Sequence, residues 1–133
     1  MDLAPVAYVD ASALFKLVIE EAESIAFRNE ADAWPTWVSS ELVEVEILRA
    51  TRRHGPAAVK TAQRRLESIT LLPIDRDIRR GAGEIDDPHL RTLDAIHLAT
   101  ALSLGTRCGV LFAYDRRLAD AARAYDIPVS APA

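Results

Sequence analysis

The sequence predicts an α/β fold, in which a central parallel sheet of about four to five strands carries helices on both faces. Short apolar runs alternate with segments of helical spacing along the whole chain of 133 residues. No two of these runs are joined by the short turn that signals a β-hairpin. Strands that are connected only through helices run parallel, and both faces of a parallel sheet are covered. Because no linker or repeat divides the chain, we expect a single domain over residues 1–133.

The first half of the chain contains clear signals for where helices begin and end. Pro35 ends the second predicted helix, and the pair Gly55-Pro56 ends the third. Ser39 or Ser40 supplies an N-cap for that third helix. These signals place strands at 6–9 and 36–39 and helices at 12–18, 21–29, 40–54 and 57–67.

The second half of the chain continues the alternation. Asp75 is a capping residue for the helix that follows it, and Gly105 ends a later helix. That later helix, 92–104, is apolar almost all round, which predicts burial on every side. The last strand contains Pro128 and is expected at an edge of the sheet. The signals place strands at 69–74, 110–113 and 127–129 and helices at 75–85, 92–104 and 116–125.

Composition narrows the possible functions. No apolar run reaches the roughly 20 residues of a membrane span. Since the N-terminus also lacks a secretory signal, we expect a cytoplasmic protein with no membrane partner. The single Cys108 cannot form an internal disulfide and is expected to lie in the core, and one Cys with three His does not make a zinc site. The net charge of −4 argues against a general nucleic-acid coat.

Positive charge is unevenly distributed. Residues 20–46 contain eight acids and one base, whereas residues 49–65 contain six bases and no acid. Almost all of the positive charge is Arg, whose guanidinium group can bind phosphate through two parallel hydrogen bonds. The arginines are either solvated helix surface or a surface for a phosphate chain, and the candidates for phosphate contact are Arg49, Arg52, Arg53, Arg116 and Arg117.

Two acids follow predicted strands directly. Asp10 comes after strand 6–9 and Asp115 after the strand that ends at Ala113, and helical spacing begins behind each acid. The carboxyl ends of parallel strands lie at one edge of a sheet, where α/β proteins bind ligands. If these two strands are neighbours, about 4.8 Å apart, their carboxylates can share a cation. Each acid taken alone could also be an ordinary helix cap.

Two further acids are expected to face inward from helices. At about 3.6 residues per turn, Glu46 falls in the middle of the apolar side of its helix, whereas Glu41 and Glu44 fall outside that side. Asp94 begins the apolar helix and would be buried with it. Glu46 therefore needs a partner, which could be an internal ion pair with Arg or a metal ion. Alternatively, Asp94 could only stabilise the N-terminus of its helix by interacting with the helix dipole.

Four carboxylates at one sheet edge repel each other unless a cation neutralises them. A ligand set made only of oxygens suits Mg²⁺ or Mn²⁺ rather than Zn²⁺. Such an ion commonly activates water and holds a phosphate ester for displacement. The set Asp10, Glu46, Asp94 and Asp115 therefore predicts metal-dependent phosphodiester hydrolysis, with arginines holding the phosphate chain.

Each of the four acids lies within a short motif. The motifs are YVDASA at 8–13, VEILRA at 45–50, LDAIHLATA at 93–101 and YDRRL at 114–118. In this order and spacing the chain resembles the PIN-domain ribonucleases, in particular the VapC-type toxins of bacterial type II toxin–antitoxin (VapBC) pairs. The third motif carries most of this resemblance, which extends over nearly the whole chain.

The resemblance implies a three-layer α/β/α PIN-like sandwich and an Mg²⁺ or Mn²⁺ site formed by the four acids. It also implies endonucleolytic cleavage of RNA, a homodimer, and a VapB-type antitoxin that neutralises the protein. Ser12 would support Asp10 or a metal-bound water, and the candidate arginines would contact RNA. The family often has Thr or Ser two residues before its fourth acid, and here that residue is Ala113, which removes a possible hydrogen bond near the metal.

Two alternatives come from other classes. A phosphatase or a phospho-accepting receiver domain would also place an Asp after the first strand, but it needs a Lys late in the chain, and none follows Lys60. A non-catalytic PIN-like module that binds RNA or a partner stays open. The four acids argue against that module and Ala113 argues for it. We expect His97 to be a core histidine bonded to the backbone or to an acid, rather than a general base.

Overall fold

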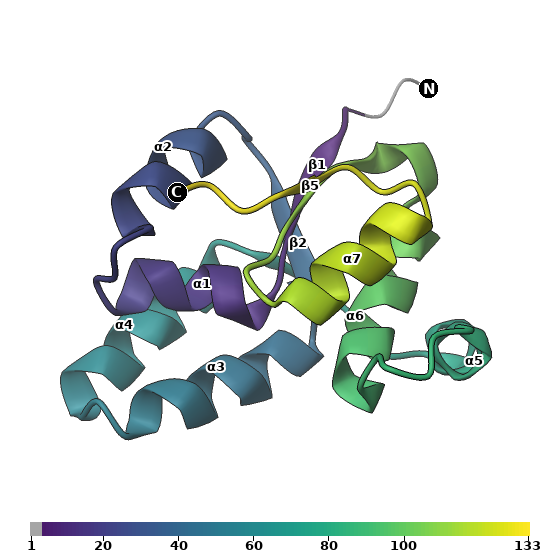
Figure 1. Ribbon diagram of the computed structural model, residues 1–133. Coiled ribbons are helices and arrows are strands. Elements are labelled where there is room, and N and C mark those ends of the chain that lie inside the picture. The colour runs from purple at the N-terminus through teal and green to yellow at the C-terminus, as the bar shows by residue number, and fades with distance from the viewer. Residues whose placement is uncertain (1–3) are drawn as a thin grey trace.

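The central sheet contains five parallel strands in the order β3-β2-β1-β4-β5 in the computed structural model, which describes residues 4–133 (Figure 1). The strands are β1 (Val6–Val9), β2 (Trp37–Ser40), β3 (Thr70–Leu72), β4 (Cys108–Phe112) and β5 (Val129–Ser130). The expected α/β class and the all-parallel sheet are confirmed. The last strand, which begins directly after Pro128, lies at the sheet edge, as expected.

Helices cover both faces of the sheet, which gives the expected three layers (Figure 1). The helices α1 to α4 lie on one face, α6 and α7 lie on the other, and α5 packs against α6. The helices are α1 (Ala11–Val18), α2 (Ser24–Ala31), α3 (Leu42–Arg52), α4 (Pro56–Glu67), α5 (Arg76–Glu84), α6 (Thr92–Ser103) and α7 (Arg116–Ala124), with a short 3-10 helix at Gly105–Arg107. Within residues 4–133, no helix has the length and apolar character that crossing a membrane requires.

The central strand β1 supplies side chains to two hydrophobic cores. Successive side chains of a strand point to opposite faces, so Val9 joins the core beneath α1 to α4 while Tyr8 joins the core beneath α6 and α7. All four residues of β1 are buried, which explains its unbroken apolar run. On the first face, the rings of Phe27 and Phe112 meet edge to face with their centres 5.2 Å apart.

The strand order places the ends of β1 and β4 side by side. The chain moves outward from β1 to β2 and β3, and then returns to pair β4 on the other side of β1. Val9 is in register with Phe112, and the Asp10 N–H donates to the Phe112 carbonyl at 3.2 Å. This change of direction makes a switch point at the carboxyl edge of the sheet, where open α/β folds bind ligands. The expected adjacency of the strands before Asp10 and Asp115 is confirmed.

The expected burial of α6 on every side is wrong. His97 to Ala101 are buried, but the Leu93 side chain in the first turn is 48% exposed and Asp94 is half-buried. The contacts explain this, because α6 reaches the sheet through its middle and its apolar side also packs against α5. The apolar side chains of α6 therefore pack against both the sheet and α5, and neither neighbour covers its first turn.

Candidate active site at the carboxyl edge of the sheet

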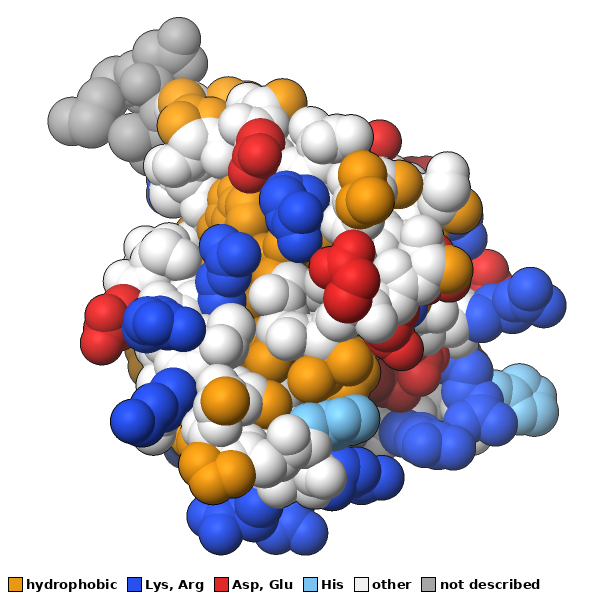
Figure 2. Space-filling view, turned by 90° about the vertical axis from the view of Figure 1, so that its left-hand side faces the viewer, with side chains coloured by type: hydrophobic (Ala, Val, Ile, Leu, Met, Phe, Trp, Pro, Cys, Tyr) orange, Lys and Arg blue, Asp and Glu red, His pale blue; other side chains and the backbone are white. Residues whose placement is uncertain are grey.

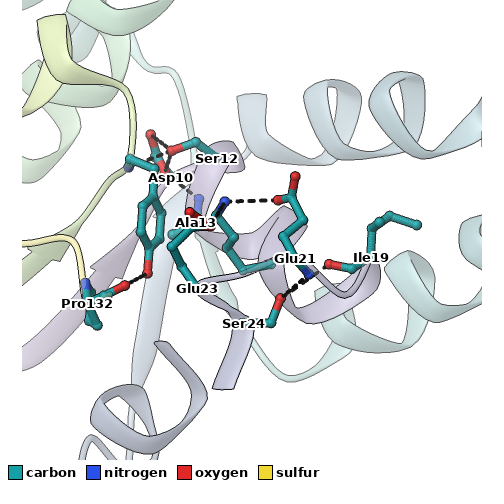
Figure 3. Close-up of polar contacts among 10 residues, drawn as sticks. Asp10, Ser12, Ala13, Ile19, Glu21, Glu23, Ser24 and Pro132 are labelled. Atoms are coloured by element: carbon teal, nitrogen blue, oxygen red, sulfur yellow. Dashed lines mark hydrogen bonds and ion pairs between the residues drawn. The ribbon is translucent and has the colours of Figure 1, made fainter. Parts of the chain in front are cut away.

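Asp10 is both a helix cap and a buried acid. Its Oδ1 accepts the Ala13 N–H at 2.9 Å, which begins α1. The Ser12 hydroxyl lies 2.7 Å and 2.9 Å from the two carboxylate oxygens and can donate to either (Figure 3). With 4% of the residue exposed, burial raises the pKa of the Asp10 carboxyl to about 6, against the opposing effects of nearby His97 and of these hydrogen bonds.

Ser12 connects the two strand ends. Besides donating to Asp10, its hydroxyl oxygen accepts the Tyr114 N–H at 2.8 Å. Tyr114 immediately precedes Asp115, which caps α7 by accepting the Leu118 N–H at 3.1 Å. The same hydroxyl therefore orients one acid and holds the backbone beside another. The two strand ends are therefore linked by Ser12, although Ala113 has no hydroxyl group to contribute.

Glu46 finds its partner in His97, not in an Arg. Its Oε1 lies 2.5 Å from His97 Nε2, and its side chain is 22% exposed. His97 Nδ1 lies 2.6 Å from the Tyr8 hydroxyl, whose oxygen accepts the Ser40 N–H at 3.1 Å. We assign the hydroxyl hydrogen to the bond with Nδ1, which leaves the Nε2 hydrogen for Glu46. The expectation that His97 is a core histidine bonded to an acid is confirmed, since only 1% of it is exposed.

Sequence reasoning missed Tyr8 as part of this site. Burial raises the pKa of its hydroxyl, so the hydroxyl keeps its hydrogen. A Tyr in the middle of a buried strand requires a hydrogen-bond partner for its hydroxyl, and that requirement was a usable signal. The sequence did not indicate that this partner is His97, because 89 residues separate the two.

Asp94 shares the electrostatic field of the other acids. Burial raises the pKa of its carboxyl, and the negative charges of Asp115 and Glu46 raise it further, while His97 and Arg91 act in the opposite direction. Glu46 likewise raises the pKa of Asp10. We refer to Asp10, Glu46, Asp94 and Asp115 as the acid cluster.

The acid cluster does not form a closed ligand sphere. Within residues 4–133, no three His, Cys, Asp or Glu side chains converge closely enough to hold a metal ion. The donor chemistry nevertheless fits Mg²⁺ or Mn²⁺, because the acid cluster offers only carboxylate oxygens. Mg²⁺ usually keeps several waters and uses one or two protein carboxylates together with substrate phosphates. An open arrangement of this kind is compatible with that mode of binding.

The five candidate arginines are all exposed. Arg49, Arg52 and Arg53, the α3-end arginines, lie at the last turn and C-cap of α3, and the other two begin α7 directly after Asp115. None of the ion pairs formed within the described part of the chain includes any of the five. Figure 2 shows basic side chains around apolar and acidic surface on the side of the molecule that it views. These guanidinium groups are therefore available to an anionic ligand.

Comparison with known proteins gives consistent matches. The PIN domain family matches residues 7–124. Ribonuclease VapC46 of Mycobacterium tuberculosis is 42% identical over 125 residues, which cover 94% of this chain and 96% of that protein. Ribonuclease VapC35 of the same species is 40% identical over 129 residues, with the same two coverages.

Solved structures with the same fold include a toxin and a chain of a toxin–antitoxin complex. One is the crystal structure of Mycobacterium tuberculosis VapC20, described as a Sarcin-Ricin loop cleaving toxin, with a TM-score of 0.71 and 21% identity over 86% of this chain and 94% of that one. The other is a toxin–antitoxin complex from Klebsiella pneumoniae, with a TM-score of 0.73 and 21% identity over 96% of this chain and 98% of that one.

Proposed function

Because this chain belongs to the PIN-domain family and is of the VapC type, we propose that it is an Mg²⁺- or Mn²⁺-dependent endoribonuclease and the toxin of a VapBC toxin–antitoxin module. Residues 1–133 would form its single domain. The proposal rests mainly on the buried Asp10 carboxylate at the switch point, whose pKa the nearby Glu46 carboxylate raises further. The curated relatives are named ribonucleases, which supports RNA as the substrate.

The roles of the side chains follow from their surroundings. A bound Mg²⁺ or Mn²⁺ ion would supply a Lewis acid and an activated water for attack on the phosphodiester. Asp10 and Asp94, whose pKa values are raised mainly by burial and further by neighbouring acids, are the first candidates to hold it. Ser12 keeps the Asp10 carboxylate oriented, and the bond from His97 does the same for Glu46. Asp115 completes the set.

The exposed arginines would hold the RNA backbone next to the acid cluster. The α3-end arginines lie on the same helix as Glu46, at its C-terminal end, and Arg116 and Arg117 begin α7 directly after Asp115. Guanidinium groups bind phosphate oxygens in pairs and carry no base preference of their own. This arrangement would fix the register of the strand and leave sequence choice to other contacts.

We further propose a VapB-type antitoxin as the protein partner, a homodimer as the assembly and the cytoplasm as the site of action. A structural neighbour of the same fold is described as a toxin–antitoxin complex, which supports the first of these. An acidic site needs a basic or polar inhibitor segment to compensate its charge. The gene next to this one should therefore encode a short DNA-binding protein with such a segment.

A non-catalytic PIN-like binding module is the second candidate. The open acid cluster favours it, since no three acids within residues 4–133 form a metal site, and so does Ala113. Metal-dependent turnover separates the two candidates, because a binding module would retain RNA without cutting it.

The test is RNA cleavage by the purified protein with Mg²⁺, with Mn²⁺ and with EDTA. Asp94→Asn removes one charge from a half-buried position and should lower the cleavage rate by at least about 100-fold, because a metal ion contributes several kcal/mol to catalysis. Glu44→Gln is the matched control, since Glu44 is an exposed acid on α3 outside the cluster. Cleavage that persists undiminished in both Asp94→Asn and Asp10→Asn would refute the assigned site.

A further inference from the structure

An apolar pocket of about 400 Å³ lies beside Asp10, between α1, the end of α3 and the segment that follows β4. The side chains that matter for its chemistry are Ser12, Phe15, Lys16, Arg53, His54 and Tyr114. On the side of the molecule that Figure 2 views, apolar side chains adjoin a histidine, with acidic side chains beside them. Ser12 and Arg53 already have proposed roles, but no ligand has been assigned to the pocket itself.

We propose that the pocket is a nucleobase subsite, which receives the base of a nucleotide next to the scissile phosphate. This inference rests on the proposed ribonuclease function, because the base and the phosphate would belong to one RNA strand. Proteins that read single-stranded RNA commonly take up unstacked bases against aromatic side chains.

The position of the pocket links it to the acid cluster. Ser12 lines the pocket and also donates to the Asp10 carboxylate, so the two sites share a side chain. Tyr114 lines the pocket as well, and Asp115 is the next residue. A strand whose phosphate lies at the acid cluster therefore has its neighbouring nucleotide at the mouth of the pocket.

The aromatic side chains are held in place. The rings of Phe15 and His54 meet edge to face with their centres 5.6 Å apart. The Tyr114 hydroxyl donates to the Pro132 carbonyl at 2.6 Å, and the Lys16 ammonium lies 4.7 Å from the centre of the Tyr114 ring. Stacking of a base on such a surface contributes about 5- to 150-fold in affinity and tolerates different bases.

The charges at the pocket suit a nucleotide better than an apolar side chain. The Lys16 ammonium pairs with Glu21 at 2.9 Å and with Glu23 at 2.7 Å, so its charge is fully compensated and the three side chains together carry one net negative charge (Figure 3). Arg53 is exposed and takes part in none of the ion pairs within residues 4–133. The pocket thus combines aromatic surface with a guanidinium group that is free of ion pairs within residues 4–133 and can contact the phosphate of a nucleotide whose base lies in the pocket.

The test measures binding of short single-stranded RNAs in EDTA, where no cleavage is needed. A series of oligonucleotides carries one abasic nucleotide at successive positions. For the wild type, the abasic nucleotide next to the cleavage position should lower affinity by at least about 5-fold. His54→Ala should lower affinity for the intact RNA by a similar factor and should abolish the abasic penalty at that position. Tyr125→Ala, which removes an exposed aromatic side chain outside the pocket, is the control.

The outcomes separate the subsite from the proposed function. Wild-type cleavage together with an abasic penalty that His54→Ala leaves intact would overturn the subsite and keep the ribonuclease. RNA binding with a His54-dependent penalty but no cleavage with either metal would support the subsite and overturn the ribonuclease. If His54→Ala leaves RNA binding unchanged but abolishes inhibition by the antitoxin, the occupant is a protein side chain and the nucleobase subsite is wrong.

Discussion

Replacing Asp10 by Asn should stabilise the protein at neutral pH even though it removes an acid from the candidate active site. Burial raises the pKa of this carboxyl to about 6, above its ordinary value of 3.8. Between these two pH values the folded protein keeps the proton while the unfolded chain releases it. The ionised carboxylate therefore destabilises the fold above about pH 6, and this cost disappears as the pH falls from 6 to 4.

The size of the effect follows from the same two values. A difference of about two pKa units, at 1.36 kcal/mol each, corresponds to about 3 kcal/mol of lost stability at pH 8. An Asn oxygen can still accept the Ala13 N–H and the Ser12 hydroxyl, and Asn caps a helix about as well as Asp. Asp10→Asn should therefore recover much of the 3 kcal/mol at pH 8 and almost none of it at pH 4.

Urea unfolding followed by circular dichroism, in EDTA at pH 8, 6 and 4.5, measures this difference. For a chain of this length a gain of about 3 kcal/mol raises the melting temperature by roughly 10 °C. The exposed Asp77→Asn serves as the control and should leave the free energy of unfolding unchanged within about 0.5 kcal/mol. If Asp10→Asn is no more stable than the wild type at pH 8, or if its gain does not shrink as the pH falls, the inferred burial cost is wrong.

Other substitutions test the support of the site and the packing around it. His97→Asn should weaken Mn²⁺ binding by about 10- to 100-fold in calorimetric titration. His97→Gln should weaken it less, because only the longer Gln side chain places its amide where Nε2 lies beside Glu46. Equal losses in the two variants would contradict the role of His97 in orienting Glu46. Gly109→Ala should cost about 1–3 kcal/mol in urea unfolding, because its Cβ would lie 2.5 Å from the Trp34 ring; an unchanged midpoint would show that the ring moves aside freely. Joint replacement of the three α3-end arginines by Gln should make the negative slope of log affinity for RNA against log salt shallower by up to about 2, at 0.7 per lost phosphate contact. The control is Arg107→Gln, in the 3-10 helix before β4, and an equal slope in both variants would make the α3 end ordinary solvated surface.

Ser12 changes how Ala113 is interpreted. A hydroxyl two residues before the fourth acid could bond near a metal ligand, and Ala113 has none. In this protein the Ser12 hydroxyl bonds both to Asp10 and to the Tyr114 N–H, so one residue spans the gap between the two strand ends. Ser12→Ala should therefore remove a hydrogen bond to the Asp10 carboxylate and another to the Tyr114 backbone at once. Substitution of Ser12 should accordingly disturb the site more than its short motif alone indicates.

Helix boundaries depend mostly on local chemistry and, apart from α2, were predicted to within about two residues, whereas the strand predicted at 69–74 is only Thr70–Leu72. Asp75 caps α5 by accepting the Ile78 N–H at 3.0 Å, as its position in the sequence indicated. The beginning of α2 differed, because the Ser24 hydroxyl accepts the Glu21 N–H and holds that stretch in a turn before the helix. The predicted position of the acids at strand ends also needed only local information.

By itself, the sequence determined the α/β class and the parallel sheet and indicated four candidate acids, because alternation, caps and motifs depend on neighbouring residues. Only the tertiary structure decided how far those acids converge and what holds them. The partners of Glu46 and Tyr8 are distant in the chain, and the exposure of Asp94 depends on how far α6 extends past its neighbours. Periodicity shows which side of a helix is apolar. The packing of the whole fold decides which element covers that side and how many turns of the helix it covers.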